Sequence, residues 1–233
     1  MSRSTSEAVD GRTIRWAGQR ERRRAEFVEA ALHTIAECGP ATSIEQIAAQ
    51  VGVTRTKLYR YFDGAADLHR EVARRAAAML ITELEPVWKP SGSPLEMVSI
   101  GVGAHIRWLT THTNLYLYLA CHLLTDEADA PDAITYIRAT VGALLAQLLA
   151  DYLNAFGIDP RPAEPLGFGI VGFVDSAARQ WLQQRGAYSQ EELIGQLAEW
   201  VWLLLDTTLK AGGVHLDPHE PLAKPEEIAA ARA

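Results

Sequence analysis

The amino-acid sequence predicts an all-α protein of about nine helices. Apolar residues recur at the three- and four-residue spacing of helices along most of the 233 residues, whereas the alternation of a β-strand is nearly absent. Hydrophobic residues make up 48% and charged residues 22%, which is typical of a globular chain with a sizeable core. No uncharged apolar run has the about 18 residues of a membrane-spanning helix, so we expect no membrane partner. The polar N-terminus has no signal-peptide pattern, which predicts a cytoplasmic protein.

The chain begins with a polar, irregular stretch followed by a clear helical pattern. Residues 1–18 include several arginines and are expected to form a flexible basic arm. Apolar residues at four-residue spacing from Phe27 to Ile35 predict a helix over about 19–38. Gly39 and the proline after it end this helix.

Two short helices are expected next. Ser43 with Gln46 three residues later is a capping-box pattern, which predicts a helix over 43–51 that stops at Gly52. A third helix is expected from Thr54 to about Tyr61, because the Asp-Gly pair that follows is a helix break.

Longer helices are expected in the remainder. A loop rich in proline, glycine and serine separates the first of them from the others. Apolar periodicity predicts helices at about 67–84, 94–112, 114–125, 132–156, 165–186 and 189–211. Residues 212–233 are rich in proline, alanine and charge and are expected to form a loose tail.

Charge is distributed unevenly along the chain. The total is −7, but residues 1–75 carry 13 Lys/Arg against 10 Asp/Glu, while residues 76–233 carry 9 against 19. A phosphate backbone responds to the local field rather than to the total charge. The sequence therefore directs a search for nucleic-acid contacts to the first third of the chain.

The two short helices have the pattern of a helix-turn-helix. The first has an inward stripe with the small Ala48, which lets the second helix cross closely, and Gly52 can take the positive φ of a tight turn. Val53 and Leu58 then anchor the second helix in the same small core. This packing turns other residues of the second helix outward, where a recognition helix presents them to base edges: Arg55, Thr56, Tyr59 and Arg60.

These residues resemble the TetR/AcrR family of one-component bacterial transcriptional regulators. The resemblance covers about residues 20–70 and lies in Ile47-Ala48, Val51-Gly52-Val53-Thr54, Leu58-Tyr59, Tyr61-Phe62 and Leu68. It implies an N-terminal helix-turn-helix DNA-binding domain over 19–66 and a larger ligand-binding and dimerisation domain over 67–211. Ala65 stands where the family usually has a phosphate-contacting lysine, so Lys57 or the arginines of the arm are expected to replace that contact.

The resemblance also implies roles for individual residues. Thr54 caps the recognition helix and bonds a phosphate, Arg55 and Thr56 face base edges, and Arg55 is the candidate for a bidentate contact to guanine. The other DNA-binding residues are expected to be Ser43, Lys57, Tyr59 and Tyr61. For Tyr59 and Tyr61, simple packing against the first helix remains the alternative.

Arginines before and at the start of the first long helix are further candidates for DNA contact. Such an arm can reach phosphates or an adjacent minor groove. The alternative is a solvated charged face in which Glu21 and Glu26 pair locally. The arginines are Arg12, Arg15, Arg20, Arg22, Arg23 and Arg24, of which Arg22 and Arg23 are the principal candidates.

The C-terminal part of the chain is expected to bind a small, largely apolar ligand and to form a homodimer. Aromatic and polar groups on apolar helices would line a ligand pocket, although each alone also fits ordinary core. The ligand-binding candidates are Trp108, His105, Tyr116, His122, Tyr136 and Phe173. The last helix is too widely apolar to be covered on one side. The resemblance implies that the last two long helices pair with those of a second subunit, through Gly169, Gly172, Ser176, Leu197, Val201 and Leu205.

Other functional classes find little support in the sequence. The seven histidines have no metal-ligand spacing, and we expect no metal and no cofactor. A G-x-G-x-x-G pattern at 167–172 follows a proline-rich stretch instead of a strand, which excludes a dinucleotide fingerprint. No catalytic constellation is present, so we expect no enzyme.

The functional hypothesis is a ligand-responsive DNA-binding homodimer that acts as a repressor. An apolar ligand would release it from a palindromic operator on double-stranded DNA by shifting the two recognition helices away from half-sites one helical turn apart. Two alternatives stay open: an all-α enzyme with an apolar pocket, and a helical protein–protein adaptor.

Overall fold

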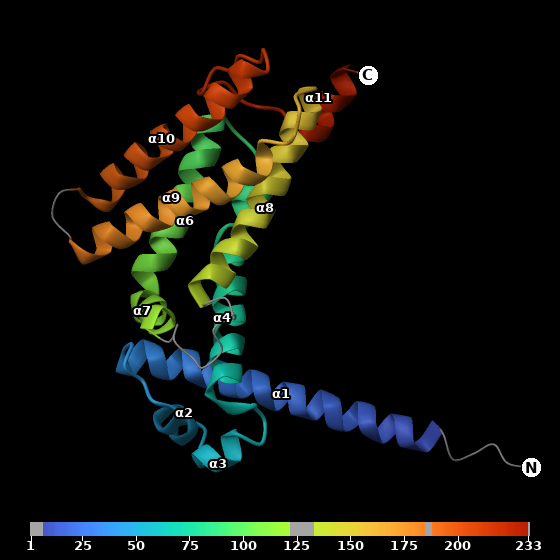
Figure 1. Cartoon of the computed structure of the whole chain (residues 1–233), viewed down its shortest axis with the longest axis vertical. Helices are drawn as coiled ribbons and strands as arrows, with labels where there is room; N and C mark the ends of the chain where they lie inside the picture. Colours follow the sequence, from blue (N-terminus) through green and yellow to red (C-terminus); the bar gives the residue numbers. More distant parts are fainter. Residues whose placement is uncertain (1–6, 122–132, 185–187, 233) are drawn as a thin grey trace, which may run out of the picture. The chain divides into compact units, whose positions relative to one another are not determined.

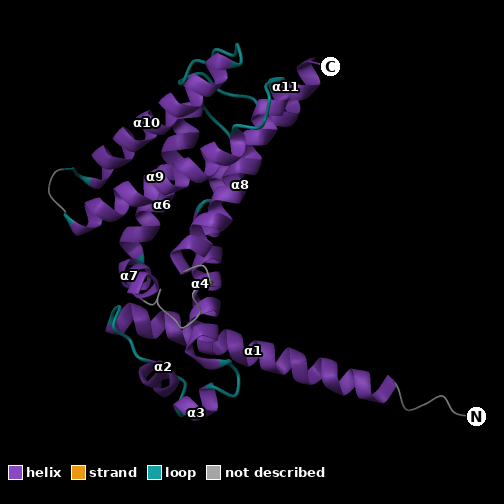
Figure 2. Ribbon diagram, in the orientation of Figure 1, coloured by secondary structure: helices purple, strands orange, loops and turns teal. Residues whose placement is uncertain are grey.

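The described part of the chain is entirely helical. The computed structural model describes residues 7–121, 133–184 and 188–232, with side chains from residue 18 onward, and these contain helices and loops but no strand (Figure 2). The all-α prediction is therefore confirmed. The helices are α1 (Glu7–Cys38), α2 (Ile44–Gln50), α3 (Arg55–Leu58), α4 (Gly64–Glu83), α5 (Glu85–Trp88), α6 (Pro94–Thr111), α7 (Thr113–Cys121), α8 (Ala133–Ala155), α9 (Ala163–Gln183), α10 (Gln190–Ala211) and α11 (Pro225–Arg232).

Helix α1 is longer than the sequence pattern indicates. It begins at Glu7 and not near Gln19, so most of the expected irregular arm is helical. The first 39 residues contain no proline, and their Glu, Ala and Arg residues favour a helix even where no apolar stripe marks one. Apolar periodicity detects the part of a helix that carries a regular apolar stripe and misses an extension without one.

The expected loose tail is also partly helical and packs on the chain. Pro225 at the start of α11, acidic Glu226 and Glu227 in its first turn and Arg232 in its last turn suit the helix dipole. Before it, the Leu222 amide donates to the Gly92 carbonyl at 2.9 Å. Helix α11 and the short, proline-started α5 raise the described total to eleven helices, two more than the pattern predicts.

The chain forms two compact units, and α4 contributes to both. The first unit comprises residues 1–75 and 114–133, with α1, α2, α3, the first part of α4 and α7 (Figure 1). The second comprises residues 76–113 and 134–233, with the end of α4, α5, α6 and α8–α11. The unit containing the helix-turn-helix thus includes a segment that lies about 40 residues further along the chain.

A small apolar core holds the first unit together. Phe27 of α1 contacts the rings of Tyr61 and Phe62, with centroid distances of 5.3 and 6.0 Å. Ala48 and Leu58 are fully buried, as the helix-turn-helix pattern predicts. Burial of these side chains removes apolar surface from water and fixes α2 and α3 on α1.

In the second unit α8 and α9 approach each other through glycine. A Cβ at Gly167 would lie 2.7 Å from the Ala146 backbone nitrogen, so no larger residue fits. Gly167 also begins the G-x-G-x-x-G pattern, which lies inside α9. The first glycine of the pattern therefore serves helix packing, in agreement with the exclusion of a dinucleotide fingerprint.

A buried carboxylate links three helices of the second unit. Asp175 of α9 accepts a hydrogen bond of 2.9 Å from Arg138 Nε of α8, and His105 Nε2 of α6 lies 3.5 Å away. The sequence suggests pairing of Asp175 with Arg179 four residues later, but the partner is Arg138. Burial opposes ionisation of Asp175, yet the hydrogen bonds and charges of His105 and Arg138 outweigh it and lower the pKa.

Replacing Asp175 by asparagine is expected to lower the free energy of unfolding by about 2–4 kcal/mol at neutral pH, because Arg138 then loses its compensating charge. Urea denaturation followed by circular dichroism measures the loss. Asp159→Asn is the matched control, since it removes an exposed carboxylate paired with Arg161 and should leave stability close to wild type. Similar stability of the two variants would contradict a structural role for the buried pair.

The same pair has a defined pH dependence. Because the pKa of Asp175 is lowered on folding, its contribution is complete above the ordinary Asp pKa of about 3.9 and is lost as the pH falls through the folded value. The stability difference between wild type and Asp175→Asn should therefore shrink below about pH 4. A difference that stays constant into acid would show that Asp175 is not ionised.

Candidate nucleic-acid interface and internal cavity

The caps and the turn of the helix-turn-helix lie where the sequence predicts them. Ser43 and Gln46 form both hydrogen bonds of the capping box at the start of α2. Gly52 has a φ of 66°, the left-handed conformation that the turn requires. Thr54 caps α3 by accepting a hydrogen bond from the Lys57 amide at 3.3 Å. Local sequence therefore defines both short helices.

Arg55 is exposed and held in place at the start of α3. Its Nη1 lies 2.6 Å from Oε1 of Glu45 on α2, and its guanidinium carbon lies 5.3 Å from the centre of the Tyr59 ring. Both partners in the ion pair are more than half exposed, so the pair is weak and can be exchanged for another acceptor. The sequence pattern does not indicate Glu45, because its role depends on the crossing of α2 and α3.

The other residues predicted for α3 divide into exposed and packed side chains. Thr56 and Lys57 are exposed. Tyr59 is half-buried beneath Arg55, and the ring of Tyr61 packs against Phe27. The packing alternative therefore holds for the ring of Tyr61, while its contact with DNA stays a prediction.

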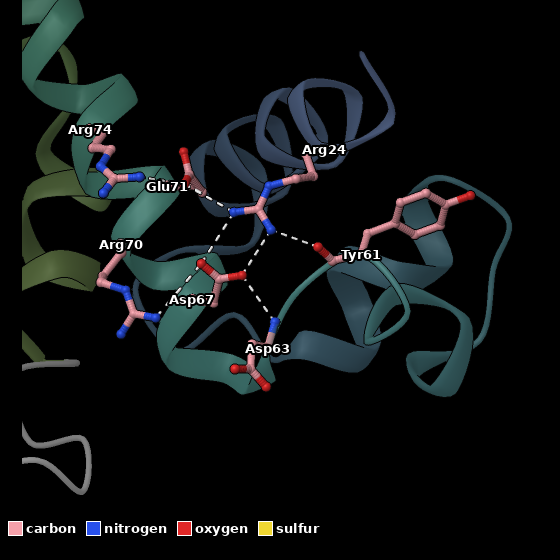
Figure 3. Close-up of polar contacts among 7 residues, drawn as sticks. All are labelled: Arg24, Tyr61, Asp63, Asp67, Arg70, Glu71 and Arg74. Carbon is pink, nitrogen blue, oxygen red and sulfur yellow. Dashed lines mark hydrogen bonds and ion pairs between the residues drawn. The ribbon is translucent and has the colours of Figure 1, made fainter. Parts of the chain in front are cut away.

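Arg24 is buried among partners of its own chain, which corrects its assignment to the arm (Figure 3). Its guanidinium donates to the Tyr61 carbonyl at 2.6 Å, to Asp67 at 2.8 and 3.2 Å and to Glu71 at 3.0 Å. Asp67 also accepts from the Asp63 amide at 3.0 Å. Arg24 thus joins α1, the segment after α3 and the first turns of α4, and both of its terminal nitrogens donate to acceptors of its own chain.

Charge and hydrogen bonding reinforce this cluster. The hydrogen bonds with Asp67 and Glu71 outweigh partial burial and raise the pKa of Arg24 above its ordinary value. The hydrogen bond from Arg24 lowers the pKa of Asp67 despite its partial burial. Arg24 and Asp67 are therefore both ionised at neutral pH. The guanidinium also lies 4.6 Å from the centre of the Phe62 ring.

The structure describes the side chains of some of the remaining arginines of the arm. Arg20, Arg22 and Arg23 are exposed on α1. Arg23 forms an ion pair with Glu26, the local pairing that the sequence offered as an alternative. The side chains of Arg12 and Arg15 lie outside the described residues.

An apolar cavity of about 190 Å³ lies inside the second unit. It is lined by aliphatic residues of α6, α8, α9 and α10, among them Val98, Val102, Val141, Leu145, Leu149, Ile170, Val174, Val201 and Leu205. Leu216 and Leu222 of the C-terminal segment complete the lining. By length and composition alone α8 would be apolar enough to cross a membrane. Its place along the cavity accounts for that composition.

Of the predicted ligand-binding residues, His105 alone lies in the lining of this cavity. Trp108 is a core residue that packs against His112, Tyr116 is buried in the first unit, and Tyr136 and Phe173 are exposed. His122 lies outside the described residues. The prediction relied on aromatic residues, whereas the observed lining is mostly aliphatic and resembles ordinary core in the sequence.

The residues predicted for the dimer interface also lie in different environments. Leu197 and Val201 are buried in the chain's own core, and Leu205 lines the cavity and is half-buried. Gly169 and Gly172 have open space beside them, and Ser176 is exposed. The exposed apolar residues of these two helices are Phe168, Phe173, Trp200, Leu203 and Leu204.

Among the described residues no group of three His, Cys, Asp or Glu side chains is placed to hold a metal ion. The polar clusters of the structure are the ion-paired groups already described around Arg24 and Asp175.

Comparison with known proteins agrees with this arrangement. Residues 27–72 match the family model described as bacterial regulatory proteins of the tetR family. An uncharacterized HTH-type transcriptional regulator from Mycobacterium tuberculosis (strain ATCC 25618 / H37Rv) is 27% identical over 206 residues, which are 88% of this chain and 86% of the relative.

Solved structures share the fold. A tetR-family transcriptional regulator from Streptomyces coelicolor has a TM-score of 0.63 at 20% identity, covering 90% of this chain and 86% of the other. The transcriptional regulator FadR from Bacillus subtilis, in complex with stearoyl-CoA, has a TM-score of 0.57 at 20% identity, covering 76% and 96%. The capped helix-turn-helix and the match over residues 27–72 thus identify the N-terminal part of the chain as a DNA-binding domain of the tetR family, and the chain has the fold of the TetR-family regulators.

Proposed function

We propose that the chain is a homodimeric repressor that leaves a palindromic operator when a largely apolar ligand enters the cavity. The observation that carries this proposal is the exposed start of α3, where a capped helix presents Arg55, Thr56 and Lys57. These side chains have the donors that base edges and phosphates require. The exposed arginines Arg20 and Arg22 of α1 add to the same positive charge.

The nature of the cavity supports an apolar ligand. Its lining contains no Asp, Glu, Lys or Arg and runs along α8 from Val141 to Leu153. At 1.5 Å per residue this part of the helix spans about 18 Å, so the lined surface is long. Such a space suits an extended hydrocarbon, and FadR of Bacillus subtilis is known in complex with a fatty-acyl thioester, stearoyl-CoA.

An exposed apolar face on α9 and α10 supports dimerisation. We name it the outer face and define it by Gly169, Gly172, Phe173, Ser176, Trp200, Leu203 and Leu204. The Phe173 and Trp200 rings have centroids 6.0 Å apart and join the two helices at this surface. Leucines and aromatic rings exposed side by side are unfavourable in water and favour burial against a second copy.

The proposal is tested by DNA binding with and without ligand. Fluorescence anisotropy with labelled DNA from upstream of the chain's own coding sequence should show binding that weakens steeply with salt. Addition of 1-decanol or decanoyl-CoA should release the DNA. Absence of DNA binding at low salt would favour the enzyme or adaptor alternatives, and DNA binding that neither compound changes would remove the proposed ligand response.

Arg55→Ala should weaken binding to the operator by about 1–3 kcal/mol and change binding to random DNA much less, because a base contact is lost. Lys57→Ala is the matched comparison, since loss of a phosphate contact should weaken both kinds of DNA alike. Anisotropy titrations on both DNAs measure the two ratios. Equal losses for Arg55→Ala would make Arg55 a phosphate contact.

Leu203→Glu should convert the dimer to monomers, because the change places an unpaired carboxylate on the outer face where the second copy would bury it. Leu203 is 57% exposed, so the isolated subunit should still fold. Light scattering after size-exclusion chromatography gives the mass. Leu144→Glu on α8, also at an exposed leucine, is the control that should remain dimeric; a dimeric Leu203→Glu would place the interface elsewhere.

A further inference from the structure

One polar group of the cavity is left without a partner. Tyr152 of α8 is 9% exposed and lies in the lining, and its buried hydroxyl has no hydrogen-bond partner in the structure. Among the other polar side chains of the lining, Trp88 donates to the Ile81 carbonyl and Thr208 donates to the Leu204 carbonyl. His105 Nε2 is buried without a hydrogen bond but lies 3.5 Å from the Asp175 carboxylate. A buried hydroxyl without a partner is unfavourable, because it has lost its hydrogen bonds with water, so a bound acceptor would stabilise it.

The hydroxyl of Tyr152 is available as a donor. Burial, together with the nearby charges of Glu226 and Glu227, raises its pKa to about 12. The group therefore keeps its proton over the whole physiological range. An oxygen acceptor on a ligand would receive that hydrogen.

The surroundings of the cavity select against a negatively charged acceptor. No lysine or arginine lies in the lining to compensate a buried carboxylate. Asp175 lies next to His105 on one side, and Glu226 and Glu227 act on Tyr152 from α11. The guanidinium of Arg138, which is partly exposed, is already bound to Asp175. A charged head group would be repelled, whereas a carbonyl, ester or hydroxyl oxygen would be tolerated.

We propose that Tyr152 donates a hydrogen bond to an uncharged oxygen of an elongated hydrocarbon ligand, such as a long-chain alcohol, ketone or ester. This inference rests on the proposed function, because it assumes that the cavity holds the effector. It goes further by naming the group of the ligand that the protein recognises. The hydrocarbon supplies most of the affinity by burial, and Tyr152 distinguishes an oxygenated chain from a bare one. The lack of a lysine or arginine in the lining disfavours an anionic chain.

The experiment measures binding directly, without DNA. Isothermal titration calorimetry compares 1-decanol, decane and sodium decanoate on the wild-type chain and on Tyr152→Phe, which keeps the ring and removes the hydroxyl. We expect 1-decanol to bind the wild type about 3- to 10-fold more tightly than it binds Tyr152→Phe, the range for one hydrogen bond. Decane should bind the two proteins equally, and decanoate should bind the wild type more weakly than 1-decanol.

Thermal unfolding of the ligand-free proteins separates recognition from a structural role. Because the hydroxyl has no internal partner, Tyr152→Phe should unfold at the same temperature as the wild type or higher. A clear fall in Tm would show an internal partner and overturn the proposal, as would equal affinity of both proteins for 1-decanol or tighter binding of decanoate. Binding of 1-decanol as expected, with no release of DNA, would contradict the proposed function and leave the recognition by Tyr152 standing.

Discussion

The position of the recognition helix depends on one guanidinium group. Arg24 bonds the carbonyl of Tyr61 directly after α3 and two carboxylates at the start of α4. The helix α3 has only four residues and too few hydrogen bonds to hold its own orientation. Fixing the chain directly after α3 to α1 supplies what the short helix lacks. A guanidinium suits this role because its planar array of donors can serve three acceptors at once.

The helix α4 carries two members of this cluster and contributes residues to both units. Its first turns carry Asp67 and Glu71, which bind Arg24, and its last residues belong to the unit that contains the cavity. The two weakest contacts of the site, those of Arg55 with Glu45 and Tyr59, remain free to be exchanged for DNA.

The sequence predicts the parts of the molecule that depend on near neighbours. The capping box at Ser43, the cap at Thr54 and the positive φ of Gly52 each need only a few adjacent residues, and all three are confirmed. The network of Arg24 joins residues up to 47 positions apart, so no local pattern distinguishes this arginine from Arg22 or Arg23. Periodicity likewise shows that α10 is apolar on more than one side. It does not show that Leu197 faces the core, Leu205 the cavity and Leu203 the solvent, because that division depends on how the helices pack.

The central claim, a sequence-specific homodimeric regulator, is tested most directly by selecting DNA from a random pool with the full chain. The account predicts enrichment of an inverted repeat whose half-site centres lie about 34–36 Å apart, one helical turn, or a multiple of it. Selection of a single half-site, or of no common sequence, would contradict the claim.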